Sequence, residues 1–163
     1  MRKQTVYGLL CFFTLAFCLS ATPSAIAASA EEEVLQVAIN QDKAMNTSDF
    51  ELLSSLWWHS PKTSFFGPIK KGAFLYQGWE AIGKLLKETL NVPEGTYNFT
   101  LHHPKVTMLG DNAAVTTTYH TSVRTDPETK EQTIGHDRFT MVLQKIDGKW
   151  LIVHNHISYL PVE

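Results

Sequence analysis

The sequence predicts a single α+β domain in which helices pack on one side of an antiparallel sheet. Residues 31–57 and 79–90 contain apolar residues at helical spacing. From Thr96 onward the chain is rich in the Thr, Val, Ile and aromatic residues that are typical of strands. Near the C-terminus, Asp147-Gly148 separates two apolar runs, which is the strongest short signal for a β-hairpin. Helices followed by a run of strands indicate the α+β class.

The first thirty residues are predicted to be a secretory signal and not part of the fold. Arg2 and Lys3 give a basic start, and a nearly unbroken apolar run, 6–19, follows. Ala-x-Ala cleavage patterns end at Ala27 and Ala30. The apolar run is short for a transmembrane helix. We therefore expect an exported protein, periplasmic or secreted, that has no membrane contact after cleavage.

Both cysteines, Cys11 and Cys18, lie in this segment, so the mature chain has no thiol and no cysteine chemistry is expected. A lipoprotein signal at Cys18, which the bulky Phe17 disfavours, and an uncleaved anchor stay open as alternatives. Without Arg2 and Lys3, the 14 basic residues become 12 against 16 acidic ones, a net charge of −4 (12 − 16). This balance argues against a nucleic-acid partner. The remaining 133 residues (163 − 30) suffice for one domain.

Three helices are expected before the main run of strands. The first, 31–46, begins with three glutamates at the positive end of its dipole. The second follows a capping box, in which Ser48 accepts from a helix amide while Glu51 reaches back. The third, 79–90, has an apolar stripe and follows Gly78.

Strands account for most of the rest. Glycine and proline punctuate the stretch 62–76, which indicates short, irregular strands. The run 97–109 contains Pro104, which requires a bulge or an edge position there. A turn then leads into 113–124, and another, 126–129, leads into the final hairpin.

The register of the final hairpin follows from its two-residue turn. With Asp147-Gly148 as the loop, Ile146 pairs with Lys149, and opposed residues share a face. One face then grades from apolar near the turn to titratable at the far end: Leu143, Trp150, Ile152, Met141, His154, Phe139, His156, Asp137 and Ser158. Such a gradient is typical of a half-open pocket on a sheet.

The spacing R-x-T-x-V-x-x-K-x-D-G-x-W-x-I-V-H-x-H-x-S, from Arg138 to Ser158, resembles the closing hairpin of SnoaL-like proteins, which belong to the nuclear transport factor 2-like superfamily. Ser48-Asp49 and Gly78-Trp79 are similar to other landmarks of this family. The resemblance covers 31–163. It implies a cystatin-like cone, in which three N-terminal helices pack on a curved antiparallel sheet that encloses a pocket, and commonly a dimer. Because the family contains enzymes and modules without a known reaction, it selects no chemistry.

One departure from the family matters for the reaction. In members that resemble ketosteroid isomerase, the general-base Asp lies in a short strand just before a proline. The corresponding stretch here is Phe65-Phe66-Gly67-Pro68, so Gly67 stands in place of the base. Steroid isomerisation is therefore rejected, because no carboxylate is available there to abstract a proton.

His154 and His156 are the candidate catalytic residues, with Asp137 as their partner. Two positions apart on one strand, the two rings project to the same face. In an apolar pocket they form an acid/base pair, and Asp137 orients His156. Two alternatives stay open: a metal site with His120 or His136 as a third ligand, although His120 is expected on the other face, and a purely structural pair. The leading hypothesis includes no metal, and the lack of a Gly-rich phosphate loop implies no cofactor.

Aromatic and apolar side chains provide the candidate ligand-binding set, because pockets for small molecules are mostly apolar with few polar groups. This set consists of Trp58, Tyr76, Trp79, Tyr119, Phe139, Met141 and Ser158. In the strands before the final hairpin, the expected turn places Tyr119 on one face with a mostly apolar group: Val106, Met108, Val115 and Thr117. Several of the tryptophans are alternatively simple core residues.

The second face of the final hairpin is the candidate partner surface. It is expected to carry Arg138, Asn155, Thr140, Val142, Leu151, Val153 and Ile157. A monomer rarely leaves so many branched aliphatic side chains in water, so a homodimer through this face is expected. The sequence thus predicts an exported domain that binds a small, largely apolar molecule. It is either an enzyme of isomerase, cyclase or lyase type, or a non-catalytic dimeric binding or assembly module.

Overall fold

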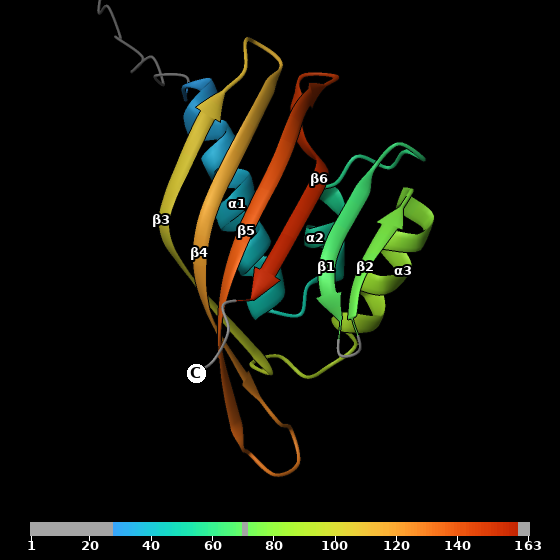
Figure 1. The fold of residues 1–163 in the computed structure, drawn as a ribbon, viewed down its shortest axis with the longest axis vertical. Helices are drawn as coiled ribbons and strands as arrows, with labels where there is room; N and C mark the ends of the chain where they lie inside the picture. Colours follow the sequence, from blue (N-terminus) through green and yellow to red (C-terminus); the bar gives the residue numbers. More distant parts are fainter. Residues whose placement is uncertain (1–27, 70–71, 160–163) are drawn as a thin grey trace, which may run out of the picture.

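The computed structural model describes residues 28–69 and 72–159. Six strands form one sheet in the order β2-β1-β6-β5-β4-β3 (Figure 1). The strands are β1 (Ser64–Ile69), β2 (Gly72–Gln77), β3 (Tyr97–Met108), β4 (Ala113–Thr125), β5 (Gln132–Ile146) and β6 (Lys149–Tyr159). The helices are α1 (Ala30–Asn46), α2 (Phe50–Ser55) and α3 (Trp79–Thr89). Apart from residues 28–30, the predicted signal lies outside the described residues.

All three helices lie on one face of the curved sheet, which we call the inner face, and the other face, the outer face, has no helix over it in the described part of the chain (Figure 1). The predicted α+β class is confirmed. The short strands expected in 62–76 precede α3, as predicted. One detail differs from the expectation: the sheet is mixed, because β1 runs parallel to β6. A parallel pair joins segments that are distant in the chain, and local patterns carry no signal for it.

The core fills the space between α1, α3 and the middle of the inner face. Its most deeply buried large side chains include Val34, Leu53, Ile82, Met141, Leu143 and Ile152. The apolar residues of α1 recur at intervals of three and four, so one side of the helix is buried. Among the described residues, no helix is both long enough and apolar enough to span a bilayer.

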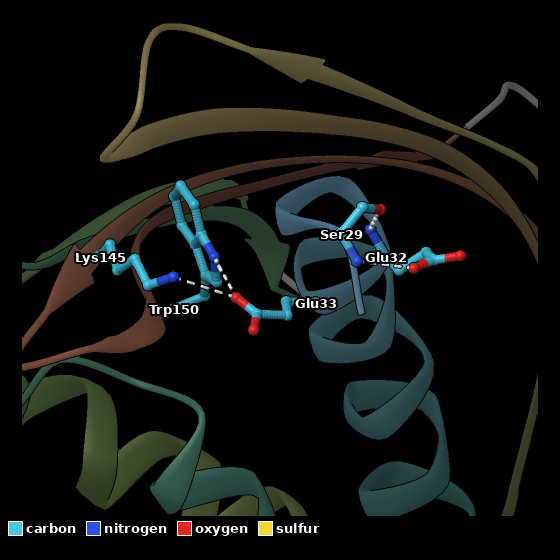
Figure 2. Close-up of polar contacts among 5 residues, drawn as sticks. All are labelled: Ser29, Glu32, Glu33, Lys145 and Trp150. Atoms are coloured by element: carbon cyan, nitrogen blue, oxygen red, sulfur yellow. Dashed lines mark hydrogen bonds and ion pairs between the residues drawn. The ribbon is translucent and has the colours of Figure 1, made fainter. Parts of the chain in front are cut away.

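The first turn of α1 is tied to the β5–β6 turn by a set of polar contacts that we call the closed end (Figure 2). Ser29 Oγ accepts from the Glu32 amide at 3.2 Å, and Glu32 Oε2 accepts from the Ser29 amide at 2.7 Å. Glu33 Oε2 accepts from Trp150 Nε1 and from Lys145 Nζ, both at 3.1 Å. The start of α1 therefore has its capping box and a direct anchor on the sheet.

The capping box predicted at Ser48 and Glu51 is wrong. The N-cap of α2 is Asp49, whose side chain accepts from the Leu52 amide at 2.9 Å, while Ser48 has a positive φ of 52°. Asp and Ser are both good N-caps, so the tandem Ser48-Asp49 made the cap position ambiguous by one residue.

The tight turn and the proline bulge are confirmed. Asp147 and Gly148 have φ values of 50° and 79°, as a type I′ turn requires, and Ile146 pairs with Lys149. In β3 the register shifts between His102 and Lys105, around Pro104. Proline has no amide hydrogen to donate to the ladder, so the shift falls where the sequence predicts it.

Beyond Leu143 and Ile152 the predicted register of the final hairpin is wrong, because β6 contains a bulge. Leu143 pairs with Ile152, but the next residue of β5, Val142, pairs with His154. Val153 is the extra residue. An insertion of one residue reverses the faces of everything that follows, because strand side chains alternate. The reversal affects all of β6 from its bulge to its end.

The expected pairing of β3 with β4 is also wrong by one residue. Val106 and Met108 pair with Thr116 and Ala114, and these four residues share the inner face. The loop at 109–112 closes through a bond from the Leu109 amide to the Ala113 carbonyl, at 2.8 Å. Three consecutive Thr residues lie in the middle of β4, so this part of the strand does not alternate between apolar and polar side chains. The sequence therefore gives no basis for choosing between the two registers.

Candidate functional site

The polar residues of the inner face gather on the half of the sheet that lies away from the closed end. His120 on β4 pairs directly with Asp137 on β5, and Asp137 pairs with Tyr159 on β6. Asp137 is the only Asp or Glu within the six strands that the structure describes. Helix α1 adds Asp42 from above. We call Asp42, Thr118, His120, Asp137 and Phe139 the inner-face site.

His120 lies at the centre of this site and is 2% exposed. Its Nε2 is 3.0 Å from Asp42 Oδ1, and its Nδ1 is 3.4 Å from Thr118 Oγ1. The Nε2 contact is close, but the ring is not aligned with the carboxylate for a hydrogen bond, so we treat it as an ion-pair contact. Asp42 faces the sheet because it lies on the buried side of α1.

Asp137 is 1% exposed, and burial raises the pKa of its carboxyl group above the ordinary value of 3.8. The Ser122 hydroxyl and the nearby rings of His120 and His136 act in the opposite direction and lower the pKa. Its Oδ1 atom has no hydrogen-bond partner among the described residues. The same holds for Asp42 Oδ2. Two buried carboxylates therefore each present a free acceptor beside one imidazole.

Aromatic rings form one wall of the site. The Phe139 ring centroid is 4.1 Å from that of His120, and Phe99 on β3 packs edge-on against Phe139 at 6.3 Å. Tyr97 continues this row at 6.0 Å from Phe99. Tyr159 lies at the margin of the site. The pKa of its phenol is raised by burial and by the neighbouring Asp137 and Tyr97. Because Tyr159 is 57% exposed, solvent screens these effects.

The predicted catalytic pair does not lie in this site. Because of the β6 bulge, His154 and His156 lie on the outer face, while Asp137 stays on the inner face. His154 Nδ1 is 2.8 Å from Ser64 Oγ, and the His156 ring lies 5.0 Å from that of Phe66. Burial, followed by the neighbouring His156, lowers the pKa of His154. The predicted contact of Asp137 with His156 is therefore absent from the described structure.

The predicted ligand-binding residues divide into three groups. Phe139 and Met141 are buried on the inner face, and Phe139 lines the inner-face site. Tyr119, which is 51% exposed, and Ser158 lie on the outer face.

The third group lies around β2 and the start of α3. Tyr76 packs against Phe65, with ring centroids 6.3 Å apart. Trp79 stacks on His59 at 4.0 Å and borders an open groove of about 630 Å³. Trp58 is half-buried next to this region. The structure therefore does not bring the seven predicted residues together.

The remaining predictions about the two faces have mixed outcomes. Asn155 and Ile157, expected on the outer face, lie on the inner face, and Asn155 is 2% exposed.

Gly67 lies beside Phe65, and a Cβ at this position would be 2.8 Å from the Phe65 Cζ atom. A carboxylate at the position of the isomerase base would therefore displace that ring. Among the described residues, no three His, Cys, Asp or Glu side chains are arranged to hold a metal.

Sequence inspection missed Asp42 and misplaced His120. A signal for Asp42 existed, because it falls between Ala38 and Met45 on the apolar side of α1, where a charged residue needs a reason. For His120 the signal was weaker, since the register of β4 was ambiguous. The apolar residue Ile157, at odd spacing from Ile152, was the one indication of the β6 bulge.

Comparison with known proteins agrees with this architecture. The family model for the SnoaL-like domain matches residues 34–163, and the chain belongs to this family. No match to a curated protein was found.

Several solved structures share the fold. A nuclear transport factor 2-like superfamily protein from Salmonella enterica is 24% identical, with 82% of this chain and 92% of that chain covered and a TM-score of 0.67. The association domain of C. elegans CaMKII is 22% identical, covers 78% and 93%, and has a TM-score of 0.64. A protein with a cystatin-like fold from Caulobacter vibrioides is 17% identical, covers 80% and 89%, and has a TM-score of 0.65. At these identities the likeness establishes the fold alone.

Proposed function

We propose that this SnoaL-like domain is exported and binds a small, largely apolar molecule at the inner-face site, where His120, Asp42 and Asp137 perform acid/base chemistry of isomerase, cyclase or lyase type. The observation that carries the proposal is the burial of two carboxylates with free acceptor oxygens around one imidazole, which contacts Asp42 and pairs with Asp137 across two strands, beside an aromatic wall. Buried polar atoms are normally paired, and the exceptions are concentrated at functional sites.

The chemistry follows from the position of each group. A carboxyl group whose pKa is raised by burial exchanges protons more readily near neutral pH than an ordinary Asp does. Asp42 contacts the His120 ring from the helix side at 3.0 Å, so a small rotation of the ring would form the hydrogen bond by which a carboxylate fixes an imidazole for proton transfer. The rings of Phe99 and Phe139 provide the apolar surface for the body of the ligand.

The test is native mass spectrometry of the protein purified from the exported fraction of its own cells. We expect a small molecule to be retained, and His120→Gln to lower its occupancy by about tenfold, which corresponds to the loss of one charged contact. His102→Gln, an exposed outer-face change on β3, is the matched control and leaves the occupancy unchanged. Equal occupancy in both variants, with both folded, contradicts the proposal.

A second candidate function, assembly through the outer face, is supported by a separate observation. This face has no helix over it in the described part of the chain and exposes Leu75, Tyr119 and Ile134 by 51–63%. One of the structures that share the fold is named as an association domain. A homodimer in which the two outer faces meet buries these side chains.

Sedimentation of wild type and Val142→Arg decides this point. Val142 is half-buried at the middle of the outer face, where it pairs with His154. We expect a dimer for the wild type at micromolar concentration and a monomer for the variant, because a two-fold axis brings two new charges together. A monomeric wild type excludes the assembly function without affecting the inner-face site.

A further inference from the structure

The inner-face site carries more negative than positive charge. Asp42 and Asp137 are both buried; His120 contacts Asp42 and pairs with Asp137 across β4 and β5, and the exposed His136 is the other basic group that acts on Asp137. Among the described residues, no Lys or Arg forms an ion pair with either carboxylate. A protonated His120 balances one carboxylate, so the site keeps one unbalanced negative charge whenever both Asp residues are ionised. A buried unbalanced charge is costly, and a bound cation relieves that cost.

The free polar atoms of the site point to the same partner. Asp42 Oδ2 and Asp137 Oδ1 have no hydrogen-bond partner among the described residues. Ionised carboxylates only accept hydrogen bonds, so the group that completes them must be a donor. An ammonium group has three donors and a positive charge, which satisfies both oxygens and the charge balance together.

The aromatic wall favours a cation as well. Phe99 and Phe139 meet edge-on at 6.3 Å, and Tyr97 extends the row. The faces of such rings attract an ammonium group and accept a flat apolar body equally well. The same wall gives no advantage to an anion, which the two carboxylates repel.

We infer that the ligand of the inner-face site is a primary amine with a flat, apolar body, whose ammonium group binds between Asp137 and Asp42. This inference rests on the proposed function, because it specifies the class of molecule bound at that site. Asp137 is the main counter-ion, since Asp42 already contacts His120. The apolar body lies against Phe99 and Phe139.

Three probes with the same ring and a two-carbon side chain test the inference: 2-phenylethylamine, 2-phenylethanol and phenylacetate. Their dissociation constants are measured by calorimetry at pH 8 on the purified protein. We expect the amine to bind about tenfold more tightly than the alcohol and the carboxylate to bind most weakly, as one additional charged hydrogen bond implies. This ranking needs no variant, so it does not depend on the folding of a mutant.

Asp137→Asn then locates the effect. The change keeps the shape and removes the charge, so the amine loses about tenfold in affinity while the alcohol changes by less than about threefold. Glu94→Gln, an exposed carboxylate in the loop after α3, is the control and leaves all three constants unchanged. Melting curves of both variants confirm that each is folded.

The outcomes separate the two proposals. If the alcohol binds as tightly as the amine, or if Asp137→Asn keeps the preference for the amine, the inference is overturned and ligand binding at the site stands. If none of the three probes binds to folded wild-type protein, the inference is overturned, while the proposed function is decided by the retained molecule and by His120→Gln in native mass spectrometry. If phenylacetate binds best, the charge balance described above is wrong.

Discussion

At the closed end, the polar side chains between α1 and the sheet are paired, whereas nine residues after Glu33 on the same helix (42 − 33) Asp42 reaches a group of side chains with free oxygens. Glu33 Oε2 accepts two hydrogen bonds from the sheet. Asp42 Oδ2 accepts none among the described residues. Both carboxylates belong to one helix and face one sheet. The difference therefore comes from the side chains of the sheet that lie opposite each carboxylate.

That difference separates stability from function. At the closed end the partner strands provide an indole and an ammonium group, and the carboxylate is partly in solvent, so pairing costs little. At the inner-face site the sheet provides a second carboxylate and an imidazole, both buried. Buried titratable side chains with free oxygens lower the stability of a fold. They are usually retained because they bind or act on a ligand. We therefore expect changes at the closed end to act on unfolding, and changes at the inner-face site to act on binding and pH dependence.

The largest effect is expected for Trp150→Ala at the closed end. The Trp150 side chain is buried in the core and also donates to Glu33. Removing it lowers the free energy of unfolding by about 3–5 kcal/mol, as for other large-to-small core changes. Urea denaturation at pH 7 measures the loss. A loss below about 1 kcal/mol would show that the closed end does not hold α1 to the sheet.

Trp150→Phe separates packing from hydrogen bonding at the same position. The ring keeps most of the apolar contacts but cannot donate to Glu33, so the expected loss is only about 1 kcal/mol plus a small cavity term. Lys145→Met, which removes the partly exposed ion pair with Glu33 and the contact of the ammonium group with the Trp150 ring at 5.6 Å, is expected to cost less than about 1 kcal/mol.

At the inner-face site, Asp137→Asn is expected to change the pH dependence of stability. Since burial raises the pKa of Asp137, the folded state binds a proton more tightly than the unfolded state does. Its contribution is fully present below the unfolded value of 3.8 and is lost as pH rises through the folded pKa. Each unit of pKa shift corresponds to about 1.4 kcal/mol.

Urea denaturation of wild type and Asp137→Asn at several pH values from 4 to 7.5 tests this sign. The variant should gain stability relative to the wild type as pH rises through this range, because it has no charge to bury. If the difference in the free energy of unfolding between wild type and variant does not change with pH, Asp137 has an ordinary pKa. The expected cost of burying its charge is then contradicted.

The same contrast explains which parts of the molecule the sequence predicts. The closed end is built from local signals: the Asp147-Gly148 turn, the glutamates of the first helical turn and the apolar residues next to Trp150. Each of these acts over a few residues, so pattern and turn chemistry suffice to place it. The helices and the α+β class follow from the same kind of signal.

The inner-face site depends instead on register, which a single inserted residue changes. Val153 reverses the faces of β6 and moves His154 and His156 away from Asp137. In the stretch Ile-Val-His-Asn-His-Ile, the odd spacing between Ile152 and Ile157 is the one indication of this bulge, and it does not say which residue is inserted. The contact between Asp42 and His120 joins α1 to β4 and so depends on tertiary packing. No short-range pattern encodes such a contact.

On the outer face, the displaced histidines lead to a prediction about assembly. The outward residues of the described strands include His102, His136, His154 and His156 together with Lys105 and Arg138, and they include no Asp or Glu. Burial lowers the pKa of His154 below its ordinary value of 6.5, so the ring is neutral at neutral pH and its contribution to stability is lost as pH falls below 6.5 and the buried ring has to take up a proton. A dimer through this face therefore gathers like charges in acid.

We expect the dimer dissociation constant to rise by about tenfold or more between pH 7.5 and pH 5.5, measured by analytical ultracentrifugation. Val142→Arg should be monomeric at both pH values. In His154→Gln the increase should be smaller, while melting curves show that the variant is folded. A dissociation constant that does not change with pH would place the interface elsewhere on the molecule.

The smallest effect concerns the start of α1 and sharpens the predicted signal cleavage. Ser29 and Glu32 form the capping box, with bonds of 3.2 and 2.7 Å, so the first turn is complete only if the mature chain retains Ser29. Cleavage after Ala27 keeps this cap. Cleavage after Ala30 removes it and places a positive α-amino group at the positive end of the helix dipole. We therefore expect the exported protein to begin at Ala28, and Ser29→Ala to lower the free energy of unfolding by about 1 kcal/mol. Intact mass of the exported protein reads the first residue directly. A chain that begins at Glu31 with unchanged stability would show that the closed end depends on Glu33 and Trp150 alone.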